Sequence, residues 1–252
     1  MSKISDFLIL NIEKEIRDGE TIVQGTSTFI PMIAVILASQ KKNINLIAGF
    51  YANPKITPKI PSTFCFENFK NGKIIGLSGF LDMLIEEKID LEFLRPAQVD
   101  KYGNMNNTVI GTHKNPKIRL PGGMGVDDIV HYAKRSILYV PNHSSKVFVD
   151  EVDFVTASGW NKGKGPDKII TNMCSFEFIG GKIILSEINP DYSVEDIIKN
   201  TGFVFEVSKK IKKMSLVDRE TKDFIKEVDP LCLRDLEIKE ERGKVLNKFK
   251  NV

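Results

Sequence analysis

Two glycine-containing segments each lie between an expected strand and an expected helix. The first, residues 25–31, is Gly-Thr-Ser-Thr-Phe-Ile-Pro, and the second, residues 122–125, is Gly-Gly-Met-Gly. Small residues let a ligand approach the backbone there, and N–H groups at a helix start bind oxyanions or phosphates. Neither segment matches G-x-G-x-x-G or G-x-x-x-x-G-K-[ST], which argues against a nucleotide-binding module. Because glycine turns also serve plain chain reversal, each segment alone is a weak indication of a site.

A third segment, residues 97–106, is rich in side-chain amides and has the sequence Ala-Gln-Val-Asp-Lys-Tyr-Gly-Asn-Met-Asn. Amides such as those of Gln98 and Asn104 both donate and accept hydrogen bonds, which suits a thioester carbonyl or an amide-containing ligand. Asn and Gly also build hydrogen-bonded turns readily, and on chemistry alone the turn is the favoured interpretation.

The other reactive side chains form no motif. The cysteines are too scattered for zinc, and the histidines show no metal spacing, so no metal site is expected. Buried, inert thiols are favoured over a Cys nucleophile, and His131, on an expected helix, is interpreted as structural. Three acids follow an expected strand; they could share a proton or hold a cation, but solvated strand-end acids are favoured. These residues are Cys65, Cys174, Cys232, His113, His131, His143, Asp150, Glu151 and Asp153.

The composition is that of a globular protein, with 252 residues of which 42% are hydrophobic. The 36 Lys and Arg residues against 33 Asp and Glu leave a net charge of +3, which indicates neither nucleic acid nor membrane as a partner. An odd number of scattered cysteines suits a reducing compartment, and no signal peptide is visible. The most apolar run, residues 29–38, is about half of a membrane span. We therefore expect a cytoplasmic protein.

The apolar pattern of the first fifty residues predicts a β-loop-α-β unit. A helix is expected from residue 4 to Gly19, a strand over 21–25, a helix from Pro31 to residue 38 and a strand over 44–48. A helical crossover implies parallel strands. The predicted fold is α/β, an open and mostly parallel sheet with helices on both faces.

Further elements are expected along the rest of the chain. Helices are predicted over 78–88, 126–134 and from Ser193 to near Gly202, a turn at 102–104, and strands over 91–94, 108–110, 137–140, 147–149, 168–171 and 182–185. The charged region after Val207 predicts two helices broken by Pro230, and the lysine-rich stretch 209–213 is interpreted as a solvated helix or loop. The expected division is a domain over 1–207 and a helical C-terminal extension over 208–252.

The order of these motifs resembles the beta subunit of family I coenzyme A transferases, such as glutaconate and 3-oxoacid CoA-transferases. The resemblance covers residues 25 to about 202. It is carried by three motifs in this order: G-T-x-x-x-x-P, A-Q-V-D-x-Y-G-N-x-N and R-L-P-G-G-x-G-x-x-D-I. The resemblance implies an acyl-CoA substrate, no permanently bound cofactor, and an alpha-type partner in a heterodimer or heterotetramer. The substrate- and CoA-binding residues that it implies are Gly25, Thr26, Gln98, Asn104, Gly122, Gly123 and Gly125.

One departure from the transferases concerns their catalytic glutamate, which attacks the acyl-CoA and becomes a glutamyl-CoA thioester. The corresponding position is Gly49, and no acid occurs between Asn45 and Lys59. The resemblance therefore implies no catalytic residue in this chain.

The beta-type subunits of bacterial acyl-CoA hydrolases that open the last steroid ring also lack this glutamate, which their alpha-type chain supplies. The sequence is similar to them at N-H-x-x-K-V-F-V-D-x-V-D, residues 142–153, and at D-P-x-x-L-R-D-x-E-I, residues 229–238. These features favour a ring-opening hydrolase subunit that cleaves a carbon–carbon bond by adding water. Two alternatives stay open: a subunit that transfers CoA between carboxylic acids, and a non-catalytic structural or regulatory subunit.

Overall fold

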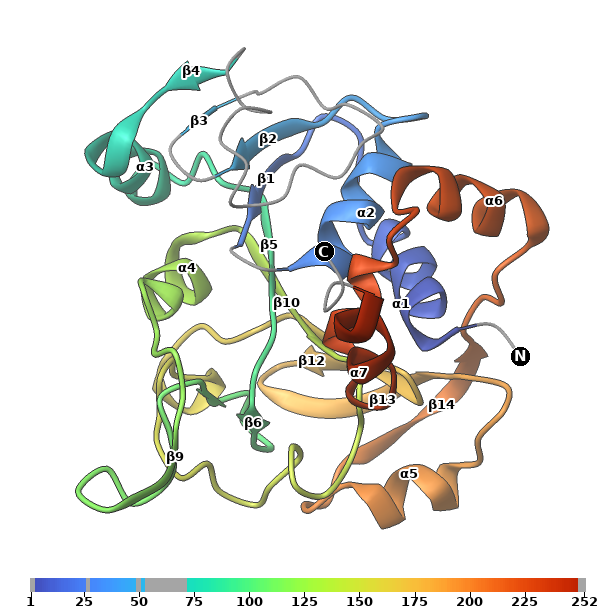
Figure 1. Cartoon of the computed structure of the whole chain (residues 1–252). Helices are drawn as coiled ribbons and strands as arrows, with labels where there is room; N and C mark the ends of the chain where they lie inside the picture. The colour runs from blue at the N-terminus through green and yellow to red at the C-terminus, as the bar shows by residue number, and fades with distance from the viewer. Residues whose placement is uncertain (1–2, 26–27, 49–50, 53–71, 249–252) are drawn as a thin grey trace. The chain divides into compact units, whose positions relative to one another are not determined.

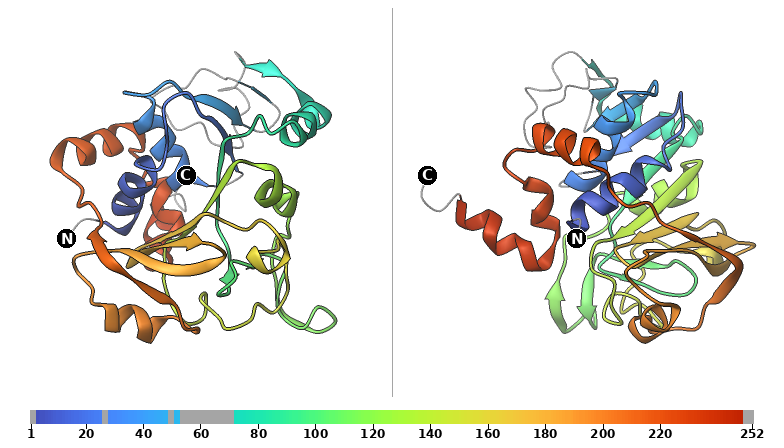
Figure 2. Two further views of the ribbon diagram at one scale, coloured as in Figure 1. Left: turned by 180° about the vertical axis from the view of Figure 1, so that it is seen from behind. Right: turned by 90° about the vertical axis from the view of Figure 1, so that its right-hand side faces the viewer.

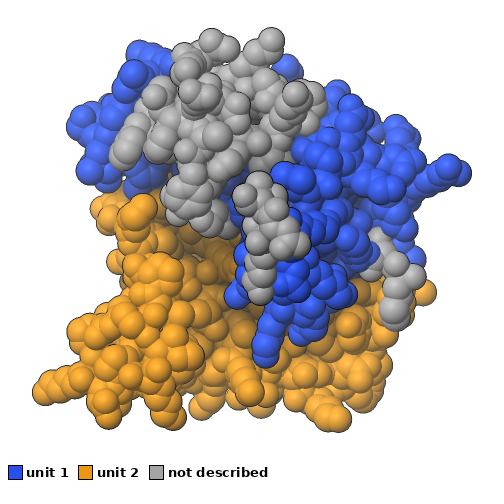
Figure 3. Space-filling view, viewed as in Figure 1, with its two compact units in different colours: residues 1–93, 215–252 blue, residues 94–214 orange. Residues whose placement is uncertain are grey.

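The computed structural model describes residues 3–25, 28–48, 51–52 and 72–248 (Figure 1). Its contacts divide the chain into two compact units, residues 1–93 with 215–252 and residues 94–214, which Figure 3 distinguishes by colour. The boundary expected at residue 207 falls inside strand β14 (Glu206–Lys213), and the elements that follow β14 belong to unit 1.

The strands of unit 1 follow the order β5-β1-β2-β3-β4. Strand β1 (Thr21–Gln24) pairs in parallel with β2 (Asn45–Ala48) and with β5 (Leu91–Leu94), and helix α2 (Phe29–Ala38) connects β1 to β2. The predicted β-loop-α-β unit is therefore confirmed. The short strands β3 (Tyr51–Ala52) and β4 (Lys73–Ile74) add antiparallel pairs, and helix α3 (Gly76–Ile85) precedes β5.

Helices α1 (Ile4–Glu13) and α2 pack against each other in unit 1. Helix α2 carries no charged residue. Nearly all of its side chains are buried, because α6 (Arg219–Val228) and the 3₁₀ turn η3 (Leu233–Glu237) contact it in addition to α1 (Figure 2). Helix α7 (Lys239–Lys248) packs on η3. The two helices predicted on either side of Pro230 are confirmed. None of the described helices is long and apolar enough to cross a membrane.

Unit 2 has the strand order β14-β13-β12-β11-β10. Strand β10 (Arg135–Val140) pairs in parallel with β11 (Lys168–Thr171). Strand β12 (Cys174–Ile179) pairs antiparallel with β11 on one side and with β13 (Lys182–Ile188) on the other. Strand β13 pairs in parallel with β14. Two hairpins precede them. These are β6 (Gln98–Val99) with β7 (Met105–Asn106), and β8 (Val109–Gly111) with β9 (Pro116–Arg119).

The helices of unit 2 are α4 (Val126–Tyr132) and α5 (Val194–Asn200), with a 3₁₀ turn, η2 (Trp160–Lys162). The capping box predicted at the start of α5 is confirmed, since the Ser193 side chain accepts from Asp196 N and the Asp196 side chain from Ser193 N. The open α/β fold predicted from the sequence is thus observed, with antiparallel pairs added to the parallel ones.

Two local predictions were wrong. The lysine-rich stretch 209–213 is part of strand β14 and not a helix or loop, and residues 147–149 form only an isolated bridge, Val99 to Phe148. Strand β14 ends the strand order of unit 2, where lysines keep an open edge from pairing with other chains. An edge strand with both faces exposed lacks the apolar alternation that identifies a half-buried strand.

Candidate functional site

In the first glycine segment, hydrogen bonds link Gly25, after β1, to Thr28, before α2. Thr28 Oγ1 donates to the Gly25 carbonyl oxygen at 2.9 Å, and Gln24 Nε2 donates to the Gly25 and Thr28 carbonyl oxygens at 3.1 and 2.9 Å. Thr26, which was also predicted to bind substrate, lies outside the described residues.

The start of α2 is held by a side chain from the far end of the chain. Glu237 is 2% exposed, and its Oε1 accepts a hydrogen bond from Ile30 N at 2.8 Å. An acid at this position complements the positive end of the helix dipole. One N–H group of this helix start is therefore already used within the protein.

Glu92, which belongs to none of the motifs found in the sequence, lies beside Gly25. It pairs with Val23 in the β1–β5 ladder and is 3% exposed, and its Oε2 has no hydrogen-bond partner among the described residues. Its Oε1 lies 3.7 Å from the position that a Cβ on Gly25 would occupy. Burial raises the pKa of Glu92 to about 8, so the carboxyl group is mainly protonated at neutral pH. The signal in the sequence is an acid inside the buried strand Leu-Glu-Phe-Leu.

The amides of the segment 97–106 are engaged inside unit 2. Asp100 Oδ1 accepts from the Tyr102 and Asn104 N–H groups, and Asn104 Nδ2 donates to Asp100 Oδ2 at 2.8 Å. Asn104 Oδ1 accepts from Gly159 N at 2.7 Å. Gln98 Oε1 accepts from Asn106 Nδ2 and from the backbone N–H of residue 153. These atoms build the turn between β6 and β7, and a substrate-binding role for Gln98 and Asn104 stays a prediction.

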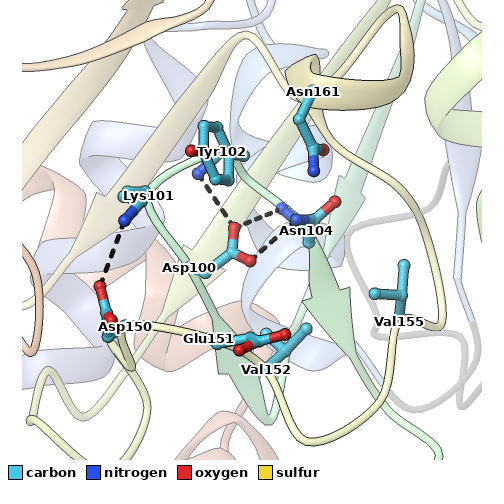
Figure 4. A pocket seen from close by; sticks show the side chains of 9 residues that line it. All are labelled: Asp100, Lys101, Tyr102, Asn104, Asp150, Glu151, Val152, Val155 and Asn161. Atoms are coloured by element: carbon cyan, nitrogen blue, oxygen red, sulfur yellow. Dashed lines mark hydrogen bonds and ion pairs between the residues drawn. The ribbon is translucent and has the colours of Figure 1, made fainter.

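A pocket of about 230 Å³ opens beside this turn (Figure 4). Its lining includes the carboxylates of Asp100, Asp150 and Glu151, and Lys101 Nζ lies 3.3 Å from Asp150 Oδ1. The acidic lining does not suit the phosphates of CoA. Of the acids singled out in the sequence, Asp150 is solvated beside Lys101, and Asp153 Oδ2 accepts a hydrogen bond from Gly111 N.

The second glycine segment contacts Asn107, which directly follows the segment 97–106 in unit 2. Gly122 N donates to the Asn107 carbonyl oxygen at 2.7 Å, and a Cβ on Gly123 would lie 2.9 Å from Thr156 Cγ2. Thr156 Oγ1 in turn accepts from Asn107 N. Gly125 has a φ of +83° just before α4, a conformation that glycine adopts without strain. The second segment thus contacts Asn107, the residue after the segment 97–106, while Gly25 belongs to unit 1.

The buried histidine and cysteine of unit 2 are structural. The His143 ring stacks on Phe148 and contacts the Thr171 and Thr201 hydroxyls, and burial lowers its pKa to about 3. Cys174 Sγ lies 3.7 Å from His143 Nδ1, and burial raises the pKa of this thiol well above its ordinary value. Both groups are therefore neutral, and neither is an activated nucleophile or base.

The remaining candidates form no reactive cluster. His131 Nδ1 contacts the Asp127 carbonyl oxygen one helical turn earlier, as a structural role predicts. Within the described residues, no group of three or more His, Cys, Asp or Glu side chains could hold a metal ion. Cys65 and Gly49, the residue predicted to replace the glutamate of the transferases, lie outside these residues.

Comparison with known proteins gives consistent matches. The coenzyme A transferase family profile matches residues 76–200. A 3-oxoadipate CoA-transferase subunit from Pseudomonas knackmussii is 37% identical over 139 residues, which cover 50% of this chain and 53% of that one. A glutaconate CoA-transferase subunit from Acidaminococcus fermentans is 26% identical over 88% of this chain and 90% of that one. A chain of a variant of the decarboxylase AibA/AibB superposes with a TM-score of 0.83 at 25% identity, covering 92% and 98% of the two chains.

The steroid-ring hydrolases are among the relatives but do not stand out. The IpdB subunit of the cholesterol ring-cleaving hydrolase of Mycobacterium bovis is 28% identical over 156 residues, 56% of this chain and 61% of that subunit. This sequence identity is lower than the 37% identity to the 3-oxoadipate CoA-transferase subunit. The chain matches about half of the length of that transferase subunit. A special closeness to the hydrolases, as the sequence motifs suggested, is therefore not established. The family profile, the relatives and the fold all show that the chain is similar to the coenzyme A transferase family and to its beta-type subunits.

Proposed function

We propose that this chain acts on an acyl-CoA thioester together with an alpha-type partner chain. The names of its relatives support a partner, since those proteins are single subunits of larger CoA-transferases, and AibA/AibB is a two-chain enzyme. In this proposal the backbone groups of Gly25, Gly122 and Gly123 bind the thioester, and Gln98 and Asn104 hold the turn between β6 and β7.

Within this role we propose a hydrolase that opens a ring by cleaving a carbon–carbon bond. The observation that carries the proposal is the stretch from Asn45 to Lys59, which contains no Asp or Glu to form a glutamyl-CoA intermediate. A glutamate of the partner acts as the base. Hydroxide from water adds to a ring carbonyl carbon, the adjacent carbon–carbon bond breaks, and the released carbon takes a proton while CoA stays attached.

Transfer of CoA between carboxylic acids is the second candidate. It is favoured by the 37% identity to the 3-oxoadipate CoA-transferase subunit. In that case the partner supplies the carboxylate that forms the covalent intermediate.

The test is to co-express the chain with an alpha-type chain from the same genome, and to analyse the CoA products of a cyclic 3-oxoacyl-CoA by mass spectrometry. The ring-opening proposal predicts a product heavier by one water with CoA retained, and no dependence on an acceptor acid. Acceptor-dependent exchange, with a hydroxylamine- or borohydride-trapped adduct on either chain, supports transfer instead. A pair that neither converts nor binds acyl-CoA overturns the enzyme proposal and leaves the non-catalytic role.

A further inference from the structure

Glu92 is a buried carboxyl group that the fold does not need. Other buried acids of unit 1 are engaged: Glu237 binds Ile30 N, Asp235 binds Lys3 and Ser5, and Asp229 binds Arg234. Glu92 Oε2 has no hydrogen-bond partner in the described part of the chain. Since an unsatisfied buried polar group costs about 1–3 kcal/mol, a leucine or valine would serve strand β5 better. An acid kept at such a place indicates a task other than stability.

The position of Glu92 indicates which task. Its neighbour in the ladder is Val23, two residues before Gly25, and side chains two apart lie on one face of a sheet. Oε1 therefore faces the space beside Gly25 that a side chain would otherwise fill. Ligands of open α/β sheets bind at the carboxyl ends of the strands, which is where Gly25 follows β1. A ligand oxygen entering this space comes within hydrogen-bond range of the carboxyl group.

The surroundings keep Glu92 neutral. Strands β1 and β2 and helix α2 carry no charged residue. Asp90, just before β5, accepts a hydrogen bond from Thr21 N, and Glu20, just before β1, accepts one from Arg17 N. Arg95, just after β5, belongs to unit 2. No ion pair is formed between Glu92 and a described residue. A neutral carboxyl group can donate a hydrogen bond, as a protonated aspartic acid does in the oxyanion hole of ketosteroid isomerase.

From this geometry we infer that Glu92, in its protonated form, donates a hydrogen bond to the carbonyl oxygen of the acyl-CoA on which negative charge develops. The inference rests on the proposed function but not on its finer choice. Carbon–carbon cleavage places the charge on an enolate oxygen, and transfer places it on a tetrahedral oxyanion. In either case the proton stays with Glu92 or is shared, and it returns when the oxyanion collapses. The base or nucleophile is then the glutamate proposed for the partner.

The test compares three variants of the purified two-chain complex over pH 6 to 9. A glutamine side chain also donates a hydrogen bond, so we expect Glu92→Gln to keep kcat/KM within about tenfold of the wild type. Wild-type kcat/KM should fall above about pH 8 as Glu92 ionises, and this fall should be absent in Glu92→Gln. Below about pH 8, where wild-type Glu92 is protonated, Glu92→Leu loses about 100- to 1000-fold, the usual effect of removing one oxyanion donor, and the loss shrinks at higher pH. The matched control is Glu206→Gln, an exposed acid paired with Lys182, which keeps both rate and pH profile.

A further variant tests the space itself. In Gly25→Ala the added methyl group meets Thr28 and Glu92 at ordinary contact distances of 3.5–3.7 Å, so folding is preserved while the approach to Oε1 is blocked. We expect a loss of at least tenfold in kcat/KM with an unchanged melting temperature.

The outcomes separate the two proposals. Full activity of Glu92→Leu, or an alkaline decline that persists in Glu92→Gln, overturns the role of Glu92 and leaves the acyl-CoA activity standing. If the pair binds acyl-CoA without turning it over, the affinity measured by calorimetry replaces the rate. It must then weaken above pH 8 in the wild type but not in Glu92→Gln. Absence of both binding and turnover overturns both proposals.

Discussion

Gly159 shows how a single residue without a side chain fixes the turn at Asn104. Its N–H donates to Asn104 Oδ1 at 2.7 Å, and the next residue, Trp160, donates its N–H to the Tyr102 carbonyl oxygen at 2.9 Å. A Cβ on Gly159 would lie 2.1 Å from that oxygen and 2.6 Å from Asn104 N. The turn and the segment at Gly159 therefore approach as closely as only glycine permits.

Gly159→Ala is expected to destabilise unit 2 by about 3 kcal/mol, because the clash involves backbone atoms that cannot rotate away. Trp160 is the only tryptophan of the chain, and its fluorescence during urea unfolding measures the loss locally. The control is Gly243→Ala in α7, where no atom lies within 4 Å of the new Cβ. There the better helix propensity of Ala adds up to about 1 kcal/mol of stability. Equal midpoints for Gly159→Ala and the wild type would contradict the argument.

The C-terminal elements are attached to α1 by buried charges. Arg234 is 3% exposed, and it donates from Nε to Asp6 Oδ1 at 2.8 Å and from Nη1 to Asp229 Oδ2 at 2.9 Å. Burial alone would lower the pKa of Arg234, but the two carboxylates raise it above its ordinary value, so the guanidinium stays charged. Asp235 binds Lys3 and Ser5 in the same region. The segment 229–238 therefore joins η3 to α1 and holds the start of α2.

Arg234→Met is expected to cost about 3–5 kcal/mol in the stability of unit 1, because it leaves the carboxylates of Asp6 and Asp229 buried without their partner. Thermal unfolding followed by circular dichroism measures the loss. Arg219→Met removes an arginine whose side chain is 96% exposed and pairs with Asp223, and it should change stability by less than about 1 kcal/mol. If both variants melt together, the network does not hold the C-terminal elements.

The elements that the sequence predicted are those with strong local signals. The apolar run of α2 between two short strands indicated the parallel crossover, and Ser193 with Asp196 indicated the start of α5. Strand β14 and the anchoring of η3 were not predictable in this way, because an exposed edge strand has no apolar face and Arg234 meets Asp6 across 228 residues. The binding roles of the site residues stay a prediction. Glycine loops are visible as motifs, whereas the relation of Glu92 to Gly25 depends on which strands pair.

At the scale of the whole molecule, two buried groups give stability an opposite dependence on pH. The folded-state pKa of Glu92 is raised to about 8, so its contribution is complete below about pH 4.5 and is lost as the pH rises to 8. The folded-state pKa of His143 is lowered to about 3, so its contribution is complete above about pH 6.5 and is lost as the pH falls. The two slopes cancel between roughly pH 4.5 and 6.5, which predicts a plateau of stability there for these two groups.

The alkaline side of this plateau can be assigned to one residue. Between pH 6.5 and 8 only Glu92 of the pair still titrates, and about 1.5 pH units correspond to roughly 2 kcal/mol. Urea unfolding of the wild type, followed by circular dichroism, should therefore show unit 1 weaker by that amount at pH 8 than at pH 6.5. Glu92→Gln cannot ionise and should lose this difference, and Glu206→Gln should keep it because that side chain is 57% exposed. Since Trp160 belongs to unit 2, its fluorescence reports whether the effect stays in the unit that contains Glu92. A Glu92→Gln variant that weakens with pH as much as the wild type would show that another group titrates, and would remove the neutral carboxyl group on which the oxyanion role depends.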